Sequence, residues 1–142
     1  MPDMVPEPVL VDRWRSMLTS YNRVACHLER ALQDGHGLSM SEFETLDRLV
    51  AVECEQRRMQ DLAADMYLSQ SALSRTVARL EKGGFVERAL CEADRRGIFV
   101  TVTESGLRRH AEARATHLAV LAEHLPAAAK SAKSGEPLGA GR

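Results

Sequence analysis

The spacing of apolar residues changes within the segment 59–103. Apolar side chains first recur every three or four positions, in residues 59–66 and again in 73–80, as on one face of a helix. They then recur every second position in residues 85–91 and 98–103, which together with the β-branched content is typical of strands. The pattern therefore predicts two helices followed by two strands.

A short connector joins the two predicted helices, as in a helix-turn-helix. Ser69 suits the N-cap of the second helix, because its hydroxyl can accept a hydrogen bond from a backbone N–H group of the first turn. Gly83 and Gly84 suit its end, where a left-handed residue would stop the helix. Tyr67 stands in the connector where many such turns have glycine, and it fits if its backbone stays out of the left-handed region.

The second predicted helix has a polar face of small, hydroxylated and guanidinium side chains. Its members are Ser71, Ser74, Arg75, Ala78 and Arg79. Such a face can enter the major groove of DNA, where arginine binds guanine through two hydrogen bonds and serine reaches bases or phosphates. The pattern therefore predicts a DNA-reading helix, although an amphipathic helix with a merely solvated polar face would show the same spacing.

The connection between the two predicted strands carries the adjacent cations Arg95 and Arg96. A hairpin tip of this kind can reach into a minor groove, where a narrow width concentrates negative potential. Asp94 could hold one of the guanidinium groups in position. The alternative is a solvated hairpin tip. Helix, turn, helix and charged hairpin follow one another in the order of a winged helix-turn-helix, so we expect DNA binding.

Long helical patterns flank this segment at residues 9–34 and 104–125. The first has apolar residues at near-heptad spacing and no helix of similar length beside it in sequence, which suggests a partner from elsewhere. We therefore expect both helices to form a homodimer interface. The alternative is that they pack on the chain's own core.

Three signals predict where the flanking helices begin and end. Gly35 and Gly37 should terminate the first helix. Ser41 should begin the next with a capping box, since Glu44 follows three residues later. Thr103 or Ser105 should cap the last helix.

Composition places the chain among globular proteins of one domain, with 142 residues, 44% hydrophobic content and a formal net charge of −1. Any DNA affinity must therefore come from local charge, and residues 69–96 hold six Lys or Arg against four Asp or Glu. Neither a signal peptide nor a membrane-spanning run is visible, so we expect a cytoplasmic protein without membrane contact. Residues 1–8 and the Ala-, Gly- and Lys-rich segment 126–142 are expected to be disordered.

The run LSQSALSRTVARLEKGGFVER, followed by ADRRG and VTVTESG, resembles the MarR family of bacterial transcriptional regulators. The likeness covers residues 9–125, with residues 41–103 as the DNA-binding lobe. The family signatures fall on Asp94 and Arg96 in the wing and on Val102, Thr103 and Gly106 after it. The resemblance implies a homodimer that binds a pseudo-palindromic operator and is released by a small ligand, often an aromatic acid or phenol, or by thiol oxidation. The family usually has another dimerisation helix where this chain has residues 126–142, and the sequence departs from the family there.

The resemblance also suggests residues that could sense a signal. Some members sense hydroperoxides through one cysteine held near tyrosines in the first helix, which makes Cys26 a candidate, with an inert thiol as the alternative. The three cysteines lack the CxxC spacing of a metal site.

In the family a ligand pocket lies between the dimerisation helices and the DNA-binding lobe. Trp14, Tyr21 and His27 could line it, with Arg13 or Arg23 as the partner of a carboxylate. The alternative is that Trp14 and Tyr21 belong to the core.

Histidines recur every seven residues on the last predicted helix, at positions 110, 117 and 124. They share one face but are about 10.5 Å apart along the axis, which is too far for one zinc ion within one chain. The alternative is a site whose ligands come from both copies of a dimer. We predict neither a metal nor a cofactor.

The sequence contains no Gly-rich phosphate loop, HExxH or GxSxG motif, so we do not expect an enzyme. We predict a mainly α fold with a small β-wing, acting as a homodimeric repressor of transcription. The predicted DNA-binding residues are Ser69, Gln70, Ser71, Ser74, Arg75, Arg79, Asp94, Arg95 and Arg96. The alternatives are a thiol-based redox-sensing regulator of the same family and a winged helix that binds only protein.

Overall fold

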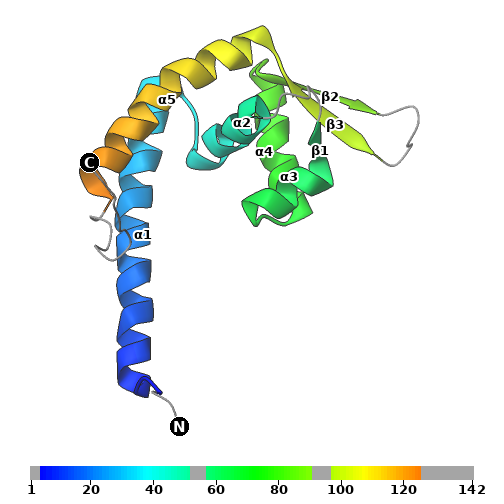
Figure 1. Ribbon diagram of the computed structural model, residues 1–142. Helices are drawn as coiled ribbons and strands as arrows, with labels where there is room; N and C mark the ends of the chain where they lie inside the picture. The colour runs from blue at the N-terminus through cyan, green and yellow to red at the C-terminus, as the bar shows by residue number, and fades with distance from the viewer. Residues whose placement is uncertain (1–3, 52–56, 91–96, 126–142) are drawn as a thin grey trace, which may run out of the picture.

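The computed structural model describes residues 4–51, 57–90 and 97–125. This part of the chain forms α1 (Glu7–His36), α2 (Met40–Ala51), β1 (Arg57–Arg58), α3 (Met59–Met66), α4 (Gln70–Lys82), β2 (Val86–Leu90), β3 (Ile98–Val102) and α5 (Glu104–His124). Figure 1 shows α1 as a long rod, and α5 packs against its upper half. The elements α2, α3, α4 and the three strands form a lobe to one side of the rod, from which β2 and β3 project.

The predicted winged helix-turn-helix with long flanking helices is confirmed. Strands β2 and β3 pair antiparallel, with Val86 opposite Val102 and Leu90 opposite Ile98. The two-residue strand β1 pairs with the other side of β3. This third strand was not predicted, because two adjacent arginines show no alternation of apolar and polar residues. Its pairing with a strand some 40 positions further along defines it.

Helix α1 begins two residues before and ends two residues after the predicted range 9–34, so Glu7 and Pro8 belong to the helix and not to a disordered N-terminus. The expected disorder of residues 1–3 and 126–142 concerns positions outside the described residues. Pro8 lies in its first turn, where the fixed φ of proline fits a helix and its missing N–H is not needed. Of the two glycines expected to end the helix, Gly35 lies inside it. Gly37 ends the helix in the left-handed region, with φ 67°, and its N–H donates to the Gln33 carbonyl at 3.0 Å.

The capping box of α2 lies two residues earlier than the predicted box at 41–44. The Ser39 N–H donates to Glu42 Oε1 at 2.8 Å, and the Glu42 N–H donates to Ser39 Oγ at 3.0 Å. Two Ser-x-x-Glu motifs overlap here, and the earlier one places Leu38 before the cap and Phe43 one turn inside the helix. Both side chains are only 1% exposed, as in a hydrophobic staple, and their burial favours the capping box that begins at Ser39.

Helix α5 begins at Thr103, the first of the two predicted caps. Thr103 Oγ1 accepts from the Gly106 N–H at 3.0 Å and donates to the Gly84 carbonyl at 2.6 Å. Gly106 is buried so closely against the strand that a Cβ there would lie 2.2 Å from the Phe85 carbonyl oxygen. The Thr-x-x-Gly sequence therefore has a structural reason, since it caps the helix and lets it touch the backbone that precedes β2.

One core holds the lobe together and joins it to the C-terminal end of α1 and to the middle of α5. Its buried members are Leu32, Leu38, Phe43, Leu46, Leu49, Leu62, Ala63, Leu73, Val77, Leu80, Val86, Val100 and Ala113. Because α1 contributes to it only near its C-terminal end, the lobe does not depend on the other half of that helix.

The apolar stripe of α1 changes its environment halfway along the helix. Val24, Leu28 and Leu32 are buried, on the part of α1 that carries α5. The same stripe continues toward the N-terminus as Leu10, Trp14, Met17, Leu18 and Tyr21, which are 40–65% exposed. The alternative that this helix packs on the chain's own core therefore holds only for its C-terminal half.

The three histidines of α5 do share one face, and each contacts another side chain. His110 is buried and lies 2.8 Å from Asp47 Oδ1. His117 stacks on Phe43, and His124 stacks on a histidine of α1, His27, with ring centroids 3.7 Å apart. No group of three or more potential metal ligands occurs among the described residues. None of the described helices combines the length and the apolar character needed to cross a membrane.

Candidate nucleic-acid interface

The helix-turn-helix is built on close packing of α3 against α4. Leu62 and Ala63 of α3 are 0% and 2% exposed, and the apolar stripe of α4, Leu73, Val77 and Leu80, is likewise buried. The small side chain of Ala63 lets the two helices approach closely. This packing fixes which face of α4 points outward.

The N-terminus of α4 is capped as predicted. Ser69 Oγ accepts from the Ala72 N–H at 3.1 Å, and it lies 3.3 Å from Ser71 Oγ. The cap satisfies one of the free N–H groups of the first turn and holds the two hydroxyl groups together at the end of the helix.

Replacing Ser69 with alanine should lower the free energy of unfolding by about 1 kcal/mol, because the Ala72 N–H loses its acceptor. Replacing it with aspartate, which can also cap, should restore most of this loss. Thermal unfolding of the three proteins tests the cap. Equal melting temperatures for the serine and alanine forms would show that the hydrogen bond adds nothing.

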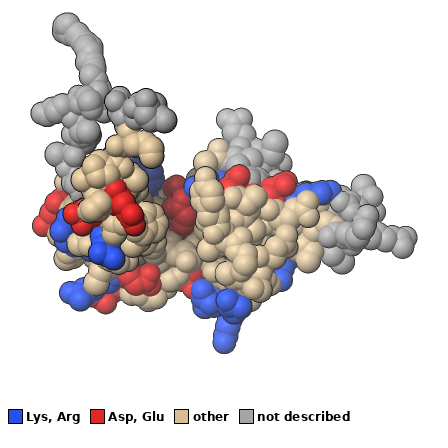
Figure 2. Space-filling model, turned by 90° about the horizontal axis from the view of Figure 1, so that it is seen from below, with Lys and Arg blue, Asp and Glu red and all other residues tan. Residues whose placement is uncertain are grey.

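The outward face of α4 carries most of the predicted contact residues. Ser69, Gln70, Ser71, Arg75, Ala78 and Arg79 are exposed, and Ser74 is half-buried. Seen from below, the lobe is mostly neutral, and charged side chains of both signs lie at its edges (Figure 2). The face of α4 therefore combines small side chains, which allow close approach, with a few cations.

Arg79 differs from Arg75 in having an ion-pair partner within the lobe. Its Nε lies 2.8 Å from Glu42 Oε2, and Glu42 is only 11% exposed. The same guanidinium group donates to Thr76 Oγ1 at 3.4 Å. The pair links α4 to α2 across 37 positions of sequence, which local spacing could not reveal. Arg79 is thus partly engaged in holding the lobe together, whereas no interaction within the described residues is seen for Arg75.

Arg88 of β2 was missed by the sequence analysis. Its Nε lies 3.2 Å from Glu81 Oε1, and its guanidinium group donates to the Ser74 carbonyl at 3.4 Å. Both partners belong to α4, so Arg88 ties the first wing strand to that helix. The strand alternation was the available signal, because it puts Arg88 on the same inward face as Val86.

The wing itself is only partly described. Strands β2 and β3 extend away from the lobe (Figure 1). Asp94, Arg95 and Arg96 lie outside the described residues, so their predicted contacts stay predictions.

The turn before α4 contradicts one expectation. Tyr67 has φ 57° and ψ 37°, in the left-handed region that it was expected to avoid. It takes the C-cap position of α3, where the backbone must reverse direction within a few residues. The tight crossing of α3 and α4 requires this geometry whichever residue occupies the position.

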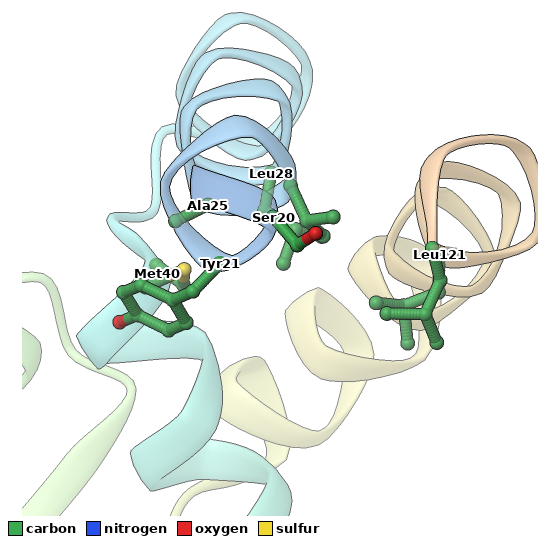
Figure 3. A pocket seen from close by; sticks show the side chains of 8 residues that line it. Ser20, Tyr21, Ala25, Leu28, Met40 and Leu121 are labelled. Atoms are coloured by element: carbon green, nitrogen blue, oxygen red, sulfur yellow. The ribbon is translucent and has the colours of Figure 1, made fainter. Parts of the chain in front are cut away.

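A cavity of about 360 Å³ lies between α1 and α5 beside the start of α2. Its lining residues are Ser20, Tyr21, Val24, Ala25, Leu28, Met40, Leu121 and Leu125. Figure 3 shows Tyr21 next to Met40, with Leu121 on the opposite side. The lining is almost wholly apolar, as suits a hydrophobic ligand or side chain.

A second cavity, of about 340 Å³, reaches from this region toward the lobe. It is lined by Tyr21, Leu28, Met40, Ser41, Glu44, Arg48, Met66, Leu68 and His117. Tyr21 thus lines both cavities. Trp14 and His27 line neither, since Trp14 is 57% exposed further along α1 and His27 stacks on His124. Cys26 is exposed on α1.

The chain is similar to proteins of one family. A family model described as MarR family matches residues 36–97. AbsC, a MarR family transcriptional regulator from Streptomyces coelicolor, is 33% identical over 87% of this chain and 82% of its own, with a TM-score of 0.76. Sco3205, a MarR family transcriptional regulator of the same organism solved in complex with DNA, is 29% identical over 88% of this chain and 78% of its own, with a TM-score of 0.78.

A MarR family transcriptional regulator from Rhodococcus sp. RHA1 is 25% identical over 85% of this chain and 86% of its own, with a TM-score of 0.75. The comparison with curated proteins found no match. Similarity to these structures extends over the long flanking helices as well as the lobe.

Proposed function

Since this chain belongs to the MarR family of DNA-binding transcriptional regulators, which are not enzymes, we propose that it is a homodimeric repressor released by a small ligand. The observation that carries the proposal is the outward face of α4, with its exposed serines and Arg75. Sco3205 was solved with DNA, which supports the same use of this fold here.

In the proposed complex α4 enters the major groove. Arg75 is the side chain suited to a guanine edge, because it is exposed and keeps its donors available. Ser69, Gln70, Ser71 and Ser74 would bind neighbouring bases or phosphates. Arg79, which is paired with Glu42, would contribute mainly to the electrostatic field near the backbone. Arg95 and Arg96 would contact the minor groove, and Asp94 would hold one of their guanidinium groups in position.

The exposed stripe on the N-terminal half of α1 supports a second copy of the chain as the partner. Five large apolar side chains on one helix face are more than a monomer usually leaves in water. Two lobes related by a twofold axis would match an operator with two inverted half-sites.

The two cavities near Tyr21 support release by a small ligand. They lie where α1, α5 and the lobe meet. A ligand there would favour one arrangement of lobe and rod over another, and only such differential affinity can shift DNA binding. The apolar lining suits an aromatic ligand, and an acidic group on it would meet Arg48, whose Nε lies 3.2 Å from Glu44 in the same lining.

Selection from a random duplex library at a stated near-physiological salt concentration tests the proposal. We expect enrichment of an inverted repeat whose half-sites are about one helical turn apart. Arg75→Ala should then weaken binding of the selected duplex roughly tenfold to a hundredfold, since a bidentate arginine contact contributes about 1–3 kcal/mol.

Arg30→Ala is the matched control, because Arg30 is exposed on α1, outside the lobe. It should bind the selected duplex nearly as tightly as the unaltered protein. A folded protein that enriches no sequence, or an Arg75→Ala variant with unchanged affinity, would reject the proposed role of α4. In a reconstituted transcription reaction from a promoter that contains the selected site, the protein should lower transcript yield. An increase in yield would show an activator instead.

A further inference from the structure

Tyr67 combines two unfavourable features in one residue. Its side chain is 94% exposed, more than any other large apolar side chain of the described residues. It is also the one non-glycine residue in the described ranges with positive φ, at 57°. A Cβ atom disfavours this backbone region, and an exposed ring buries no area to offset the cost. Glycine would fit the turn without strain. The stability of the protomer therefore gives no reason for a tyrosine here.

The turn holds this side chain in a defined place. The Tyr67 N–H donates to the Ala64 carbonyl at 3.3 Å, and the Leu68 N–H donates to the Ala63 carbonyl at 3.0 Å. Leu68 packs against the core. With the residue after it anchored inward, Tyr67 points outward from a fixed backbone. Its Cα can be no more than about 7 Å from that of Ser69, the cap of α4.

We propose that Tyr67 is a DNA-contacting residue whose phenol hydroxyl donates a hydrogen bond to a backbone phosphate beside the major groove. The inference rests on the proposed entry of α4 into that groove. A helix that enters a groove has phosphates on either side of its leading end, and a side chain just outside its N-cap is placed to meet them. The phenol is neutral at ordinary pH and offers one donor, so the contact would position the protein without reading sequence.

The surroundings of Tyr67 favour a phosphate over a protein partner. Exposed tyrosines also anchor protein interfaces, but there they cluster with other large apolar side chains. The other exposed large apolar residues of the described chain lie in the N-terminal segment and on α1 and α5. The neighbours of Tyr67 at the start of α4 are Ser69, Gln70 and Ser71, which are hydrogen-bonding side chains.

Tyr67→Phe removes only the hydroxyl group and keeps the ring. We expect it to weaken duplex binding about tenfold, as for loss of a hydrogen bond to a charged group. The loss should be similar on the selected operator and on an unrelated duplex, because phosphate contacts are independent of sequence. The slope of log Kd against log salt should not change, since a neutral phenol releases no counterion. A loss confined to the operator would overturn the phosphate assignment.

Arg75→Ala, measured in parallel, distinguishes failure of the proposed entry of α4 into the major groove from failure of the proposed Tyr67 contact. It should weaken operator binding more than binding of the unrelated duplex. If Arg75→Ala binds like the unaltered protein, the proposed entry of α4 fails. If Arg75→Ala weakens binding and Tyr67→Phe does not, the inference about Tyr67 alone is overturned.

Tyr67→Gly tests whether the tyrosine has a structural role instead. Because glycine relieves the left-handed strain, the melting temperature should stay the same or rise, while duplex affinity falls at least as far as in Tyr67→Phe. A lower melting temperature would mean that the ring stabilises the turn. It would contradict the inference that Tyr67 occupies this position because it contacts DNA.

Discussion

Replacing Gly106 with alanine is expected to destabilise the protein by about 3 kcal/mol, at the upper end of overpacking effects. The new Cβ would lie 2.2 Å from the Phe85 carbonyl oxygen and 2.8 Å from Val102 Cγ1. The carbonyl cannot move away easily, because it accepts the Thr103 N–H at 3.0 Å. The start of α5 would have to separate from the sheet. A loss of this size is a large part of the 5–15 kcal/mol that typically stabilises a domain.

Gly35→Ala provides the matched control for that substitution. A Cβ at Gly35 meets no atom within 4 Å, and the residue lies inside α1. Alanine there should stabilise the helix by about 0.5–1 kcal/mol. Chemical denaturation of both variants measures the difference. If Gly106→Ala unfolds at the same denaturant concentration as the unaltered protein, the helix is not held against the strand as closely as described.

Replacing Trp14 and Met17 together with glutamate is expected to convert the proposed dimer to a monomer and to weaken operator binding more than a hundredfold. These side chains are 57% and 65% exposed in the protomer, so their loss removes no packing from the lobe. Across a twofold interface the change introduces four carboxylates into an apolar contact, where unpaired charges are costly. The monomer would make half of the phosphate contacts, and the salt dependence of its binding should fall accordingly.

Thr19→Glu is the control for the charged variants, because Thr19 is exposed on the opposite side of α1 from Trp14 and Met17. Light scattering should give a dimer mass for Thr19→Glu and a protomer mass for Trp14→Glu/Met17→Glu. Circular dichroism should show that both retain their helices. A double glutamate variant that remains dimeric would exclude this stripe as the interface.

The features predicted well from the sequence were those determined by neighbouring residues. The two faces of α4 follow from helical spacing, and the Ser69 cap follows from its place before that helix. Residue spacing could not decide between the two overlapping capping boxes at the start of α2. The observed box of Ser39 and Glu42 is distinguished from the predicted one at 41–44 by the burial of Leu38 and Phe43.

Features that depend on distant contacts were missed or only partly described. The pairing of Arg79 with Glu42 joins two helices that sequence spacing treats separately. The left-handed backbone of Tyr67 is imposed by the crossing of α3 and α4. The stripe of α1 was recognised as unusually long, but its division into a buried and an exposed half depends on where α5 packs.

The junction between α1 and the lobe has a mechanical consequence. The connection is the short turn at Gly37, reinforced by Arg109, which donates to the His36 carbonyl at 2.6 Å. A helix of 30 residues is about 45 Å long. In the proposed dimer, tilting such a rod by about 5° at its far end displaces the attached lobe by about 4 Å, which exceeds the 3.4 Å step between base pairs. The long helix thus amplifies small rotations. A small rotation at its N-terminal end would move α4 out of register with its half-site.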